Sequence, residues 1–361
     1  MGNRFDHLQE AVNALFQEVG TIKQISSVYQ TPALGFEGAD FLNCVLWLQT
    51  NLPPETVLEK ALAIEKKMGR TRGVSNAPTS RSIDIDLLFV DNQIIETENL
   101  QIPHPEMAHR KFVLHPMAEI SPNWVHPVVG KNMVWMLAKT EDKSELKKLS
   151  KWLRNPKKEY TISNLNYLVI EGNIGAGKTS LAQQISADFN AKLILERFQE
   201  NPFLPKFYKE PTRYAFPLEM SFLADRYQQL LEDLTQYDLF SESIVADYDV
   251  YKSMIFAQIT LSEEEYTLYK KLFHLMYKEL PKPKLYVYLY QTTERLLENI
   301  KKRGREYEQS IEATYLSQIN EGYLEFIKSQ HLENVKIIDV SNMDFVENRK
   351  DYLTILKEIQ A

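Results

Sequence analysis

The chain has 361 residues, of which 44% are apolar and 25% are charged, and its formal net charge is −7. This length accommodates two domains that each bury a core, and the acidic balance excludes a nucleic-acid scaffold and favours small-molecule partners. The one cysteine, Cys44, excludes an internal disulfide framework and a zinc site of thiolates. The N-terminus is polar and no apolar stretch reaches membrane-spanning length, so we expect a cytoplasmic enzyme without membrane contact.

The first half of the chain mixes helical and strand patterns. Apolar residues recur at helical spacing over Arg4–Val19 and Glu55–Met68. Alternating patterns predict strands at Ile22–Tyr29, Asn43–Thr50 and Ser82–Val90. This order predicts an α+β layer with an antiparallel, ferredoxin-like sheet.

Two aspartates lie on the last of these predicted strands. Residues two apart on a strand share a face, so Asp84 and Asp86 should project side by side, away from the core. Adjacent carboxylates repel one another unless a cation neutralises them, and oxygen ligands suit Mg²⁺. The neighbouring sequence adds positive charge at Arg70, Arg72, Arg81, His104 and Arg110. The pattern indicates polyphosphate transfer without a P-loop, and the alternative is a solvated strand face without chemistry.

A polar, lysine-rich stretch at residues 139–164 separates the two halves. We therefore place a first domain at residues 1–152, a linker at 153–164 and a second domain at 165–361.

The second half alternates strands and helices. Strands are predicted at Tyr167–Glu171, Lys192–Glu196, Ser243–Asp247, Lys284–Tyr290 and Val335–Val340, and the longest helix at Thr212–Leu234. This order predicts an α/β fold with a parallel five-stranded sheet that binds ligands at the carboxyl ends of its strands. Glu196 and Asp247 lie at such ends.

A complete P-loop follows the first strand of this half. It consists of Gly172, Asn173, Ile174, Gly175, Ala176, Gly177, Lys178 and Thr179. Its glycines let backbone N–H groups turn toward phosphate, and the next helix adds its positive end. Lys178 would reach the terminal phosphates of ATP, and the Thr179 hydroxyl would be a ligand of Mg²⁺.

Two further features fit phosphorylation of a nucleoside, which needs a base for the 5′-hydroxyl and cations for the phosphoryl group. Glu196 would supply the base, and the alternative is a solvated acid at a strand end. The basic cluster at residues 301–309 is typical of a mobile lid that closes arginines over phosphates. The alternative for this cluster is an exposed, charged helix end.

Residues from about 163 to 361 resemble the deoxyribonucleoside kinase family. The resemblance rests on Glu196-Arg197-Phe198, Phe207-Tyr208-Lys209-Glu210-Pro211, and Arg303-Gly304-Arg305 with Glu308-Gln309. It implies that Glu196 is the catalytic base for a deoxynucleoside, with ATP as the donor. It further implies Tyr208 and Glu308 at the 3′-hydroxyl, Arg303 and Arg305 at the phosphates, and Arg226 near the base and the 5′ end. A homodimer through the kinase domain is also expected, because the family is commonly dimeric.

This half departs from the family pattern at two places. Asp247, expected at the nucleoside site, begins Asp247-Tyr248-Asp249 where many members have an acid-Arg-Ser triplet, so the arginine for the 5′ region is absent. Either Arg197 or Arg226 would replace it. Glu219 stands at the position of a base-reading glutamine, and a carboxylate only accepts hydrogen bonds. Guanine offers two adjacent donors, which favours deoxyguanosine.

Residues 1 to about 152 resemble 6-hydroxymethyl-7,8-dihydropterin pyrophosphokinase, an enzyme family of folate biosynthesis. The resemblance rests on Ser26–Gly35, Phe41–Asn43, Arg81–Asp86 and Ile102–His104. It implies transfer of pyrophosphate from ATP to the pterin hydroxymethyl group, with release of AMP and with two Mg²⁺ ions on Asp84 and Asp86.

The same resemblance assigns the remaining residues of this half. Those that bind ATP or stabilise the transferring charge are Arg70, Arg72, Arg81, Arg110, Glu65 and His104. Those that line the pterin pocket are Thr31, Pro32, Leu34, Phe41, Asn43 and Phe112. Pro78 and Pro105 replace aromatic residues of some members, which would change rates rather than abolish the reaction.

The start of the chain also departs from the family. Met1-Gly2-Asn3-Arg4 matches residues that follow the usual first strand, so we expect a true start about ten residues upstream. The alternative is a half that lacks this strand and serves as a non-catalytic assembly or binding module for the kinase. A third reading makes the P-loop a regulatory nucleotide sensor. We expect a bifunctional enzyme.

Overall fold

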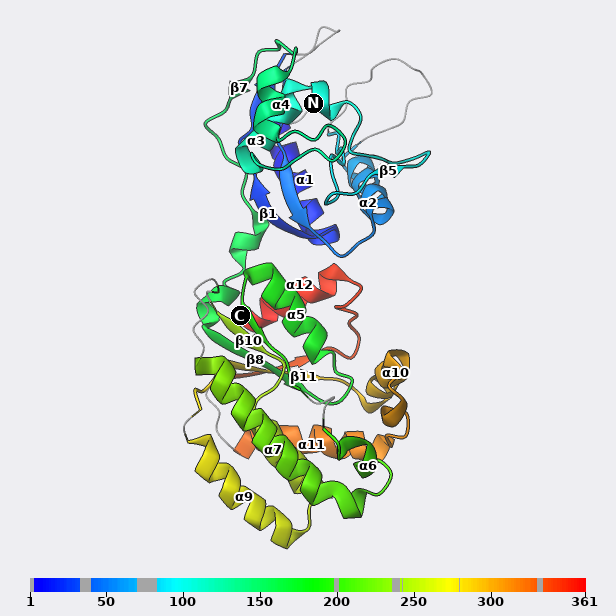
Figure 1. Cartoon of the computed structure of the whole chain (residues 1–361), viewed down its shortest axis with the longest axis vertical. Helices are drawn as coiled ribbons and strands as arrows, with labels where there is room; N and C mark the ends of the chain where they lie inside the picture. The colour runs from blue at the N-terminus through cyan, green and yellow to red at the C-terminus, as the bar shows by residue number, and fades with distance from the viewer. Residues whose placement is uncertain are drawn as a thin grey trace. The chain divides into compact units, whose positions relative to one another are not determined.

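The computed structural model describes residues 3–32, 40–69, 83–197, 201–235, 241, 243–278, 280–329 and 334–361. The chain forms two compact units, Met1–Tyr160 and Thr161–Ala361 (Figure 1). None of the described helices combines the length and apolarity that a bilayer span requires.

The N-terminal unit is built from short antiparallel sheets and helices. Its elements are α1 (Arg4–Glu18), β1 (Thr21–Ile25), β2 (Tyr29–Thr31), β3 (Phe41–Asn43), β4 (Leu46–Gln49), α2 (Pro54–Lys67), β5 (Ile95–Glu96), β6 (Gln101–Ile102), η1 (Met107–His109), α3 (Lys111–Ile120), α4 (Met133–Lys139), β7 (Lys147–Lys148) and η2 (Pro156–Glu159). Strand β1 pairs with β4, β2 pairs with β3 and β7, and β5 pairs with β6, all antiparallel. These pairings confirm the antiparallel arrangement predicted for this half.

The two predicted helices of this unit form for local reasons. Asn3 caps α1 by accepting a hydrogen bond from the Phe5 backbone N–H, and the buried residues of α1 recur every three or four positions. Helix α2 begins with Pro54 in its first turn and ends with Lys66 and Lys67 in its last. Both ends suit the helix dipole and the unpaired backbone groups there.

Side chains interrupt two of the predicted strands. The expected Ile22–Tyr29 strand breaks after Ile25, because Ser27 donates its N–H and its hydroxyl to the Glu119 carboxylate. The expected Asn43–Thr50 strand breaks at residues 44–45, where the Val45 N–H donates to the Ser26 hydroxyl. In both places a side chain replaces a ladder partner.

The predicted strand Ser82–Val90 is wrong for its described part, residues 83–90, which carry no strand. Burial still alternates along Ile83–Asp86, with both aspartates exposed. The segment contacts other elements: the Ile85 N–H donates to the Glu65 carboxylate, and the Leu88 carbonyl accepts from the His104 N–H. A strand requires a ladder of such bonds to one neighbouring strand.

The C-terminal unit contains one parallel sheet between helical layers. Its elements are η3 (Ile162–Leu165), β8 (Tyr167–Gly172), α5 (Lys178–Phe189), β9 (Lys192–Ile194), α6 (Leu204–Phe207), α7 (Pro211–Thr235), β10 (Ile244–Ala246), α8 (Tyr251–Thr260), α9 (Glu263–Tyr277), β11 (Leu285–Tyr290), α10 (Thr293–Arg303), η4 (Glu306–Glu308), α11 (Ala313–Ser329), β12 (Val335–Asp339) and α12 (Arg349–Gln360). The sheet order is β12-β11-β8-β10-β9, and every pairing is parallel. The expected parallel five-stranded sheet is therefore confirmed.

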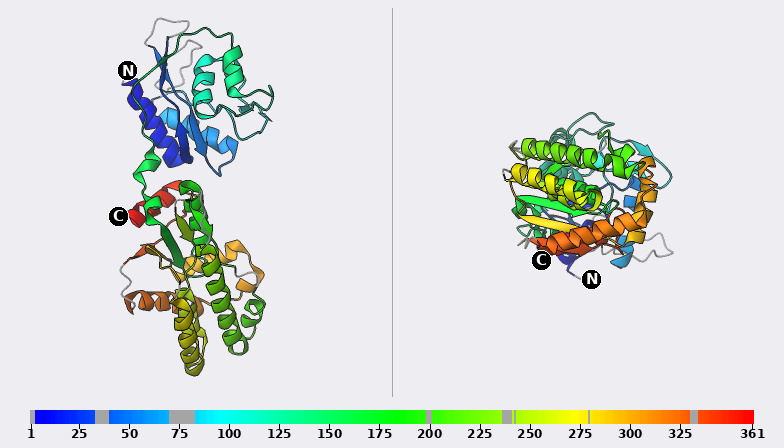
Figure 2. Two further views of the ribbon diagram at one scale, coloured as in Figure 1. Left: turned by 60° about the vertical axis from the view of Figure 1, so that its left-hand side comes forward. Right: turned by 90° about the horizontal axis from the view of Figure 1, so that it is seen from below.

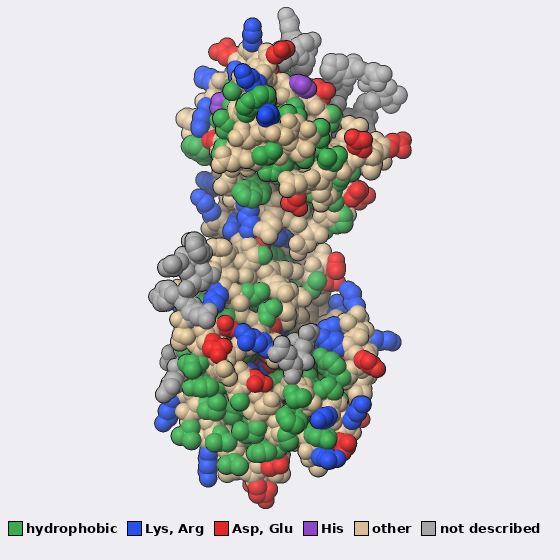
Figure 3. Space-filling view, viewed as in Figure 1, with side chains coloured by type: hydrophobic (Ala, Val, Ile, Leu, Met, Phe, Trp, Pro, Cys, Tyr) green, Lys and Arg blue, Asp and Glu red, His purple; other side chains and the backbone are tan. Residues whose placement is uncertain are grey.

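Helices cover both faces of this sheet. Helices α5 and α12 lie on one face and α7, α9 and α11 on the other, where the view from below shows them side by side (Figures 1 and 2). Strand β8 is buried along its whole length and lies at the centre of the sheet. Figure 3 shows hydrophobic side chains gathered over α7 and α9 on the visible face, and these helices carry the exposed side chains of Leu231, Leu268 and Leu275.

Candidate active sites

A glycine-rich loop joins β8 to α5 in the C-terminal unit. Gly175 and Gly177 have φ of 84° and 85°, a region that favours glycine. A Cβ on Gly177 would lie 2.6 Å from the Phe345 ring, and one on Gly175 would lie 3.0 Å from the Leu296 carbonyl oxygen. Backbone conformation and space therefore both require glycine in this loop.

Asn173 and Lys178 fix the loop from within. The buried Asn173 amide donates to the Leu316 carbonyl at 2.7 Å, which anchors the loop on α11. The Lys178 ammonium donates to the Asn173 carbonyl at 2.9 Å. Burial and the nearby charge of Lys252 lower the pKa of Lys178 to about 8. An anion bound at the start of α5 would meet this ammonium and the positive end of the helix.

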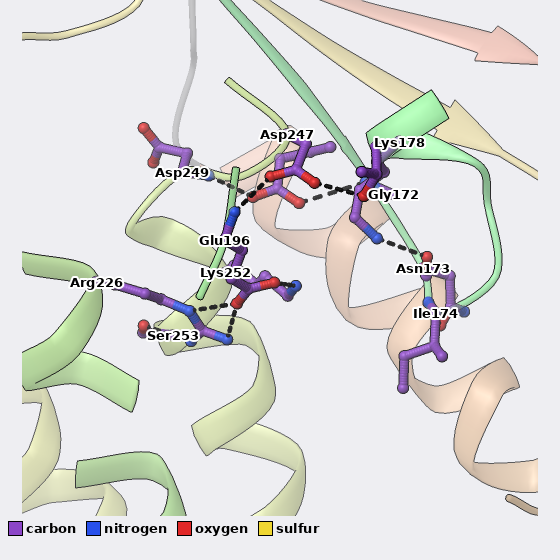
Figure 4. A network of polar contacts seen from close by, with 12 residues as sticks. Gly172, Asn173, Ile174, Lys178, Glu196, Arg226, Asp247, Asp249, Lys252 and Ser253 are labelled. Carbon is purple, nitrogen blue, oxygen red and sulfur yellow. Dashed lines mark hydrogen bonds and ion pairs between the residues drawn. The ribbon is translucent and has the colours of Figure 1, made fainter. Parts of the chain in front are cut away.

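Asp247 connects the loop to the end of β9. The Thr179 hydroxyl donates to Asp247 Oδ2 at 2.5 Å, and the Glu196 backbone N–H donates to Asp247 Oδ1 at 2.8 Å. Figure 4 shows Glu196, Asp247 and Asp249, which follow β9 and β10, in one polar network. In the same network the Asp249 N–H donates to Glu171 Oε1 at 2.7 Å. The sequence predicted the convergence of Glu196 and Asp247 on this edge of the sheet, and the structure brings them together.

Glu196 lies between two cationic side chains. Nε and one terminal nitrogen of Arg226 lie 2.8 and 2.7 Å from Glu196 Oε1, and the Lys252 ammonium lies 2.6 Å from Oε2. Burial alone would raise the pKa of Glu196, but the charges of Lys252 and Arg226 hold it well below its usual range. Glu196 is therefore ionised and oriented without a ligand.

Glu219 lies on α7, 2% exposed. The Thr260 hydroxyl donates to its Oε1 at 3.1 Å, while Oε2 is buried and has no hydrogen-bond partner among the described residues. Burial raises the pKa of Glu219 to about 7, and the charge of Arg226 opposes the rise. A buried carboxylate with one unpaired oxygen is suited to accept hydrogen bonds from a ligand.

The predicted lid residues contact one another. Arg303 and Arg305 both donate to the buried Glu308 carboxylate, Arg305 at 3.1 Å. Tyr208 stacks on Tyr307, with ring centroids 6.2 Å apart. Burial and the charge of Glu308 raise the pKa of Tyr208 well above its usual range. Tyr208, Glu308 and the two arginines are thus neighbours.

A cavity of about 2240 Å³ opens in the N-terminal unit. Its wall brings together eight of the predicted residues, Thr31, Pro32, Phe41, Asn43, Asp84, Asp86, Arg110 and Phe112. The Asn43 amide donates to the Thr31 hydroxyl at 3.0 Å, and the Arg110 guanidinium lies 5.8 Å from the Phe112 ring centroid. Both β4 and residues 83–90 line the same cavity.

Two other predicted residues hydrogen-bond to the backbone of the segment that carries Asp84 and Asp86. Glu65, 1% exposed, accepts from the Ile85 N–H at 2.7 Å, and the His104 N–H donates to the Leu88 carbonyl at 2.9 Å. Both therefore fix the segment that carries Asp84 and Asp86. The predicted residues Leu34, Arg70, Arg72 and Arg81 lie outside the described residues.

Comparison with known proteins matches each unit to a family. The deoxynucleoside kinase family matches residues 168–361, and the 7,8-dihydro-6-hydroxymethylpterin-pyrophosphokinase family matches residues 1–122. The deoxyguanosine kinase of Bacillus subtilis (strain 168) is 38% identical over 198 residues, which are 54% of this chain and 96% of that protein. The 2-amino-4-hydroxy-6-hydroxymethyldihydropteridine pyrophosphokinase of Aquifex aeolicus (strain VF5) is 39% identical over 132 residues, 36% of this chain and 81% of that protein.

The chain belongs to both families. We therefore call the two units the pyrophosphokinase-family unit and the kinase-family unit. The relatives of both are transferases, and so is this chain. A solved structure of deoxyadenosine kinase from M. mycoides has a TM-score of 0.47 and 24% identity, covering 54% of this chain and 98% of its own.

One charged residue of the kinase-family site, Lys252, was not predicted from the sequence. It left open whether Arg197 or Arg226 replaces the absent arginine; Arg197 is exposed, whereas Arg226 and Lys252 both contact Glu196. Lys252 belongs to no motif. The available signal was a lone lysine in the apolar start of α8, Tyr251–Ala257, where a charge needs a buried partner.

Proposed function

We propose that the chain is a bifunctional ATP-dependent enzyme. Its kinase-family unit phosphorylates the 5′-hydroxyl of a deoxynucleoside, and its pyrophosphokinase-family unit pyrophosphorylates 6-hydroxymethyl-7,8-dihydropterin. The observation that carries the first activity is the ionised Glu196, held by two cations beside the glycine-rich loop. We assign the activities to domains at residues 1–152 and 165–361, joined by residues 153–164, and the first domain to the ferredoxin-like class.

The kinase reaction uses the groups at the strand ends. The loop 172–179 is the P-loop, whose N–H groups and Lys178 bind the ATP phosphates. Glu196 accepts a hydrogen bond from the 5′-hydroxyl and takes its proton as the oxygen bonds to the γ-phosphorus and ADP leaves. The 3′-hydroxyl binds to Glu308 and Tyr208, and Arg303 and Arg305 then leave Glu308 and bind phosphate oxygens.

The oxygen donors beside Lys178 fit Mg²⁺, which prefers oxygen ligands. The Thr179 hydroxyl and the Asp247 carboxylate present such oxygens 2.5 Å apart. Thr179 would hold the ion, which would neutralise charge on the phosphates.

We propose deoxyguanosine as the preferred nucleoside. The N1–H and N2–H groups of guanine are adjacent donors. Ionised Glu219 offers two acceptor oxygens, and Oε2 has no hydrogen-bond partner among the described residues. The deoxyguanosine kinase name of the Bacillus subtilis relative supports this choice. Homodimerisation through the kinase-family unit stays a prediction.

The pyrophosphokinase reaction is assigned to the cavity of the other unit. Asp84 and Asp86 are exposed, lie two residues apart and would hold Mg²⁺ with the phosphates of ATP. Asn43 hydrogen-bonds the pterin edge and Phe112 stacks on the ring, which presents the hydroxymethyl oxygen for attack on the β-phosphorus. The bond from that oxygen to phosphorus forms as the α–β bridge of ATP breaks, AMP leaves, and the hydroxyl proton is released to water. Arg70, Arg81 and Arg110 stabilise the transferring charge, and Arg72, Glu65 and His104 complete the ATP site.

One experiment tests both assignments. The chain is incubated with Mg-ATP and either hydroxymethyldihydropterin or one of four deoxynucleosides, and AMP and ADP are measured. We expect pterin-dependent AMP and nucleoside-dependent ADP. Glu196→Gln should abolish ADP alone and Asp84→Asn should abolish AMP alone, so each variant is the control for the other.

The absence of either product would point to a different function. ADP without AMP, both from this chain and from one that carries the upstream residues expected above, would make the N-terminal unit a non-catalytic assembly module. ATP binding without ADP, unchanged by Glu196→Gln, would make the kinase-family unit a nucleotide sensor.

A further inference from the structure

Lys252 lies where the fold makes a buried cation unfavourable. It occupies the first turn of α8, is 7% exposed, and has no acidic residue in its own turn. The N-terminal end of a helix carries partial positive charge, so an ammonium group there is repelled. Burial adds the desolvation of a charge. Both effects oppose folding, which points to a role in the reaction.

Lys252 and Arg226 together hold the Glu196 carboxylate, which we call the clamp. Figure 4 shows Arg226 and Lys252 approaching Glu196 together. Two nitrogens of Arg226 contact Glu196 Oε1, and the Lys252 ammonium donates to Glu196 Oε2 at 2.6 Å. The neighbour of Lys252 on α8, Ser253, accepts from the third nitrogen of Arg226 at 2.7 Å. The first turn of α8 therefore fixes both cations.

Counting acceptor sites shows what the clamp leaves open. A carboxylate has about four lone-pair sites, two on each oxygen. Arg226 donates to Oε1 from Nε and places a second nitrogen 2.7 Å from the same oxygen, and Lys252 fills one site on Oε2. One site on Oε2 remains for a hydroxyl group. Its direction is set because neither oxygen is free to rotate away from its cation.

We propose that Lys252 is a positioning residue for the kinase reaction. It rotates and locks Glu196 so that the single open lone pair of Oε2 meets the 5′-hydroxyl of the acceptor. This inference rests on the proposed kinase function and adds to it the residue that orients the base. Without Lys252, two sites on Oε2 are open and the carboxylate turns about its terminal bond, so the acceptor still binds but is seldom aligned.

The test compares kinetic constants of three variants in the full chain. Lys252→Met should lower kcat about 100-fold while KM for deoxynucleoside and for ATP changes less than about threefold. Lys252→Arg restores a donor and should keep kcat within about tenfold of wild type. Propylammonium added to Lys252→Ala should raise its kcat at least about tenfold. The matched control is Lys270→Met, which removes an exposed lysine of α9 and should change nothing.

Thermal unfolding gives a second readout without activity. In Lys252→Met the buried ion pair between Arg226 and Glu196 stays balanced, so a lysine kept for positioning predicts an unchanged or higher Tm. A fall of more than about 5 °C would show that Lys252 is retained for stability.

The outcomes separate this inference from the function on which it rests. A wild-type chain that makes no ADP with any deoxynucleoside overturns the kinase function and this role with it. An active wild type with unchanged kcat in Lys252→Met overturns the role alone. Equal losses in Lys252→Met and Lys252→Arg, without amine rescue, also overturn it.

Discussion

The two units hold their acidic groups in opposite ways. In the kinase-family unit, Glu196 is buried and each of its oxygens contacts a cation, and Asp247 accepts from two neighbours. In the pyrophosphokinase-family unit, Asp84 and Asp86 are exposed at the wall of a wide cavity. The first site is organised before any ligand binds, whereas the second offers its carboxylates to a ligand that brings its own charges.

The difference follows from sheet topology. Parallel strands end at one edge, so residues that follow β8, β9 and β10 meet although they are far apart in sequence. The acidic side chains that meet there are largely buried. The antiparallel unit gathers its site from β2, β3, α3 and a segment without a ladder. Preorganisation therefore depends on the kind of sheet, and substitutions in the first site should cost more.

The largest effect is expected from Gly177→Ala. The new Cβ would clash with the Phe345 ring and force alanine into a left-handed conformation, so the phosphate-binding loop must move. We expect nucleoside-dependent ADP formation to fall about 100-fold and pterin-dependent AMP formation to stay unchanged, both measured on one preparation.

Gly130→Ala is the matched control for this change. Gly130 has φ of 68° but a Cβ there meets nothing within 4 Å, so only the conformational strain is added. Full kinase activity in Gly177→Ala would contradict the claim that this site is rigidly preorganised.

The next effect concerns Glu219. Glu219→Gln replaces one of two acceptors by a donor, so the preference for deoxyguanosine over deoxyadenosine should fall about 10- to 100-fold in kcat/KM. Burial raises the pKa of Glu219 to about 7, and the ionised form increases as pH rises through that value. In wild type, kcat/KM for deoxyguanosine should therefore rise between pH 6 and 8, and this rise should disappear in Glu219→Gln. An unchanged preference would remove Glu219 from base recognition.

A smaller effect is expected in the less organised site. Asn43→Ala removes the amide that donates to Thr31 and faces the cavity. The loss of about one hydrogen bond should raise KM for the pterin roughly tenfold and leave ADP formation unchanged. Asn13→Ala, an exposed asparagine of α1, is the control. A loss in kcat as large as that of Gly177→Ala would mean that this site too is preorganised.

The smallest effect is expected from the removal of one helix cap in each unit. Ser262 and Glu265 form a capping box on α9, and Asn132 caps α4 by accepting from the Trp135 N–H at 2.9 Å. Ser262→Ala and Asn132→Ala should each lower stability by about 1 kcal/mol and Tm by a few degrees, with both activities intact. Calorimetry should show that each shifts a different unfolding transition. A common shift would mean that the units unfold together.

The sequence predicted the kinase-family unit well because its signals are local and strong. The run Leu168–Ile170 is buried on both faces, so this central strand carries consecutive apolar residues, and Gly172 marks its end. The P-loop pattern and Glu196 after a strand then specify where the charges gather. These predictions needed only the rule that parallel strands end together.

Three features depended on contacts that sequence patterns do not encode. The break after Ile25 comes from Glu119, which is 92 residues from Ser27 in the chain. Residues 83–90 alternate like a strand but lack the ladder that defines one. Lys252 reached the site because the first turn of α8 points at Glu196, and a single lysine carries no motif. Each was decided by a neighbour distant in sequence.

The pairing of Arg303 and Arg305 with Glu308 has a consequence for the cell. In the proposed reaction, these arginines turn to the phosphates only after a sugar hydroxyl engages the acid that restrains them. With ATP bound and no nucleoside, Arg303 and Arg305 would thus stay paired with Glu308 and would not stabilise the transferring phosphoryl group. Transfer of that group to water would therefore be slow. The same carboxylate that recognises the sugar would in this way protect the nucleotide pool from idle hydrolysis.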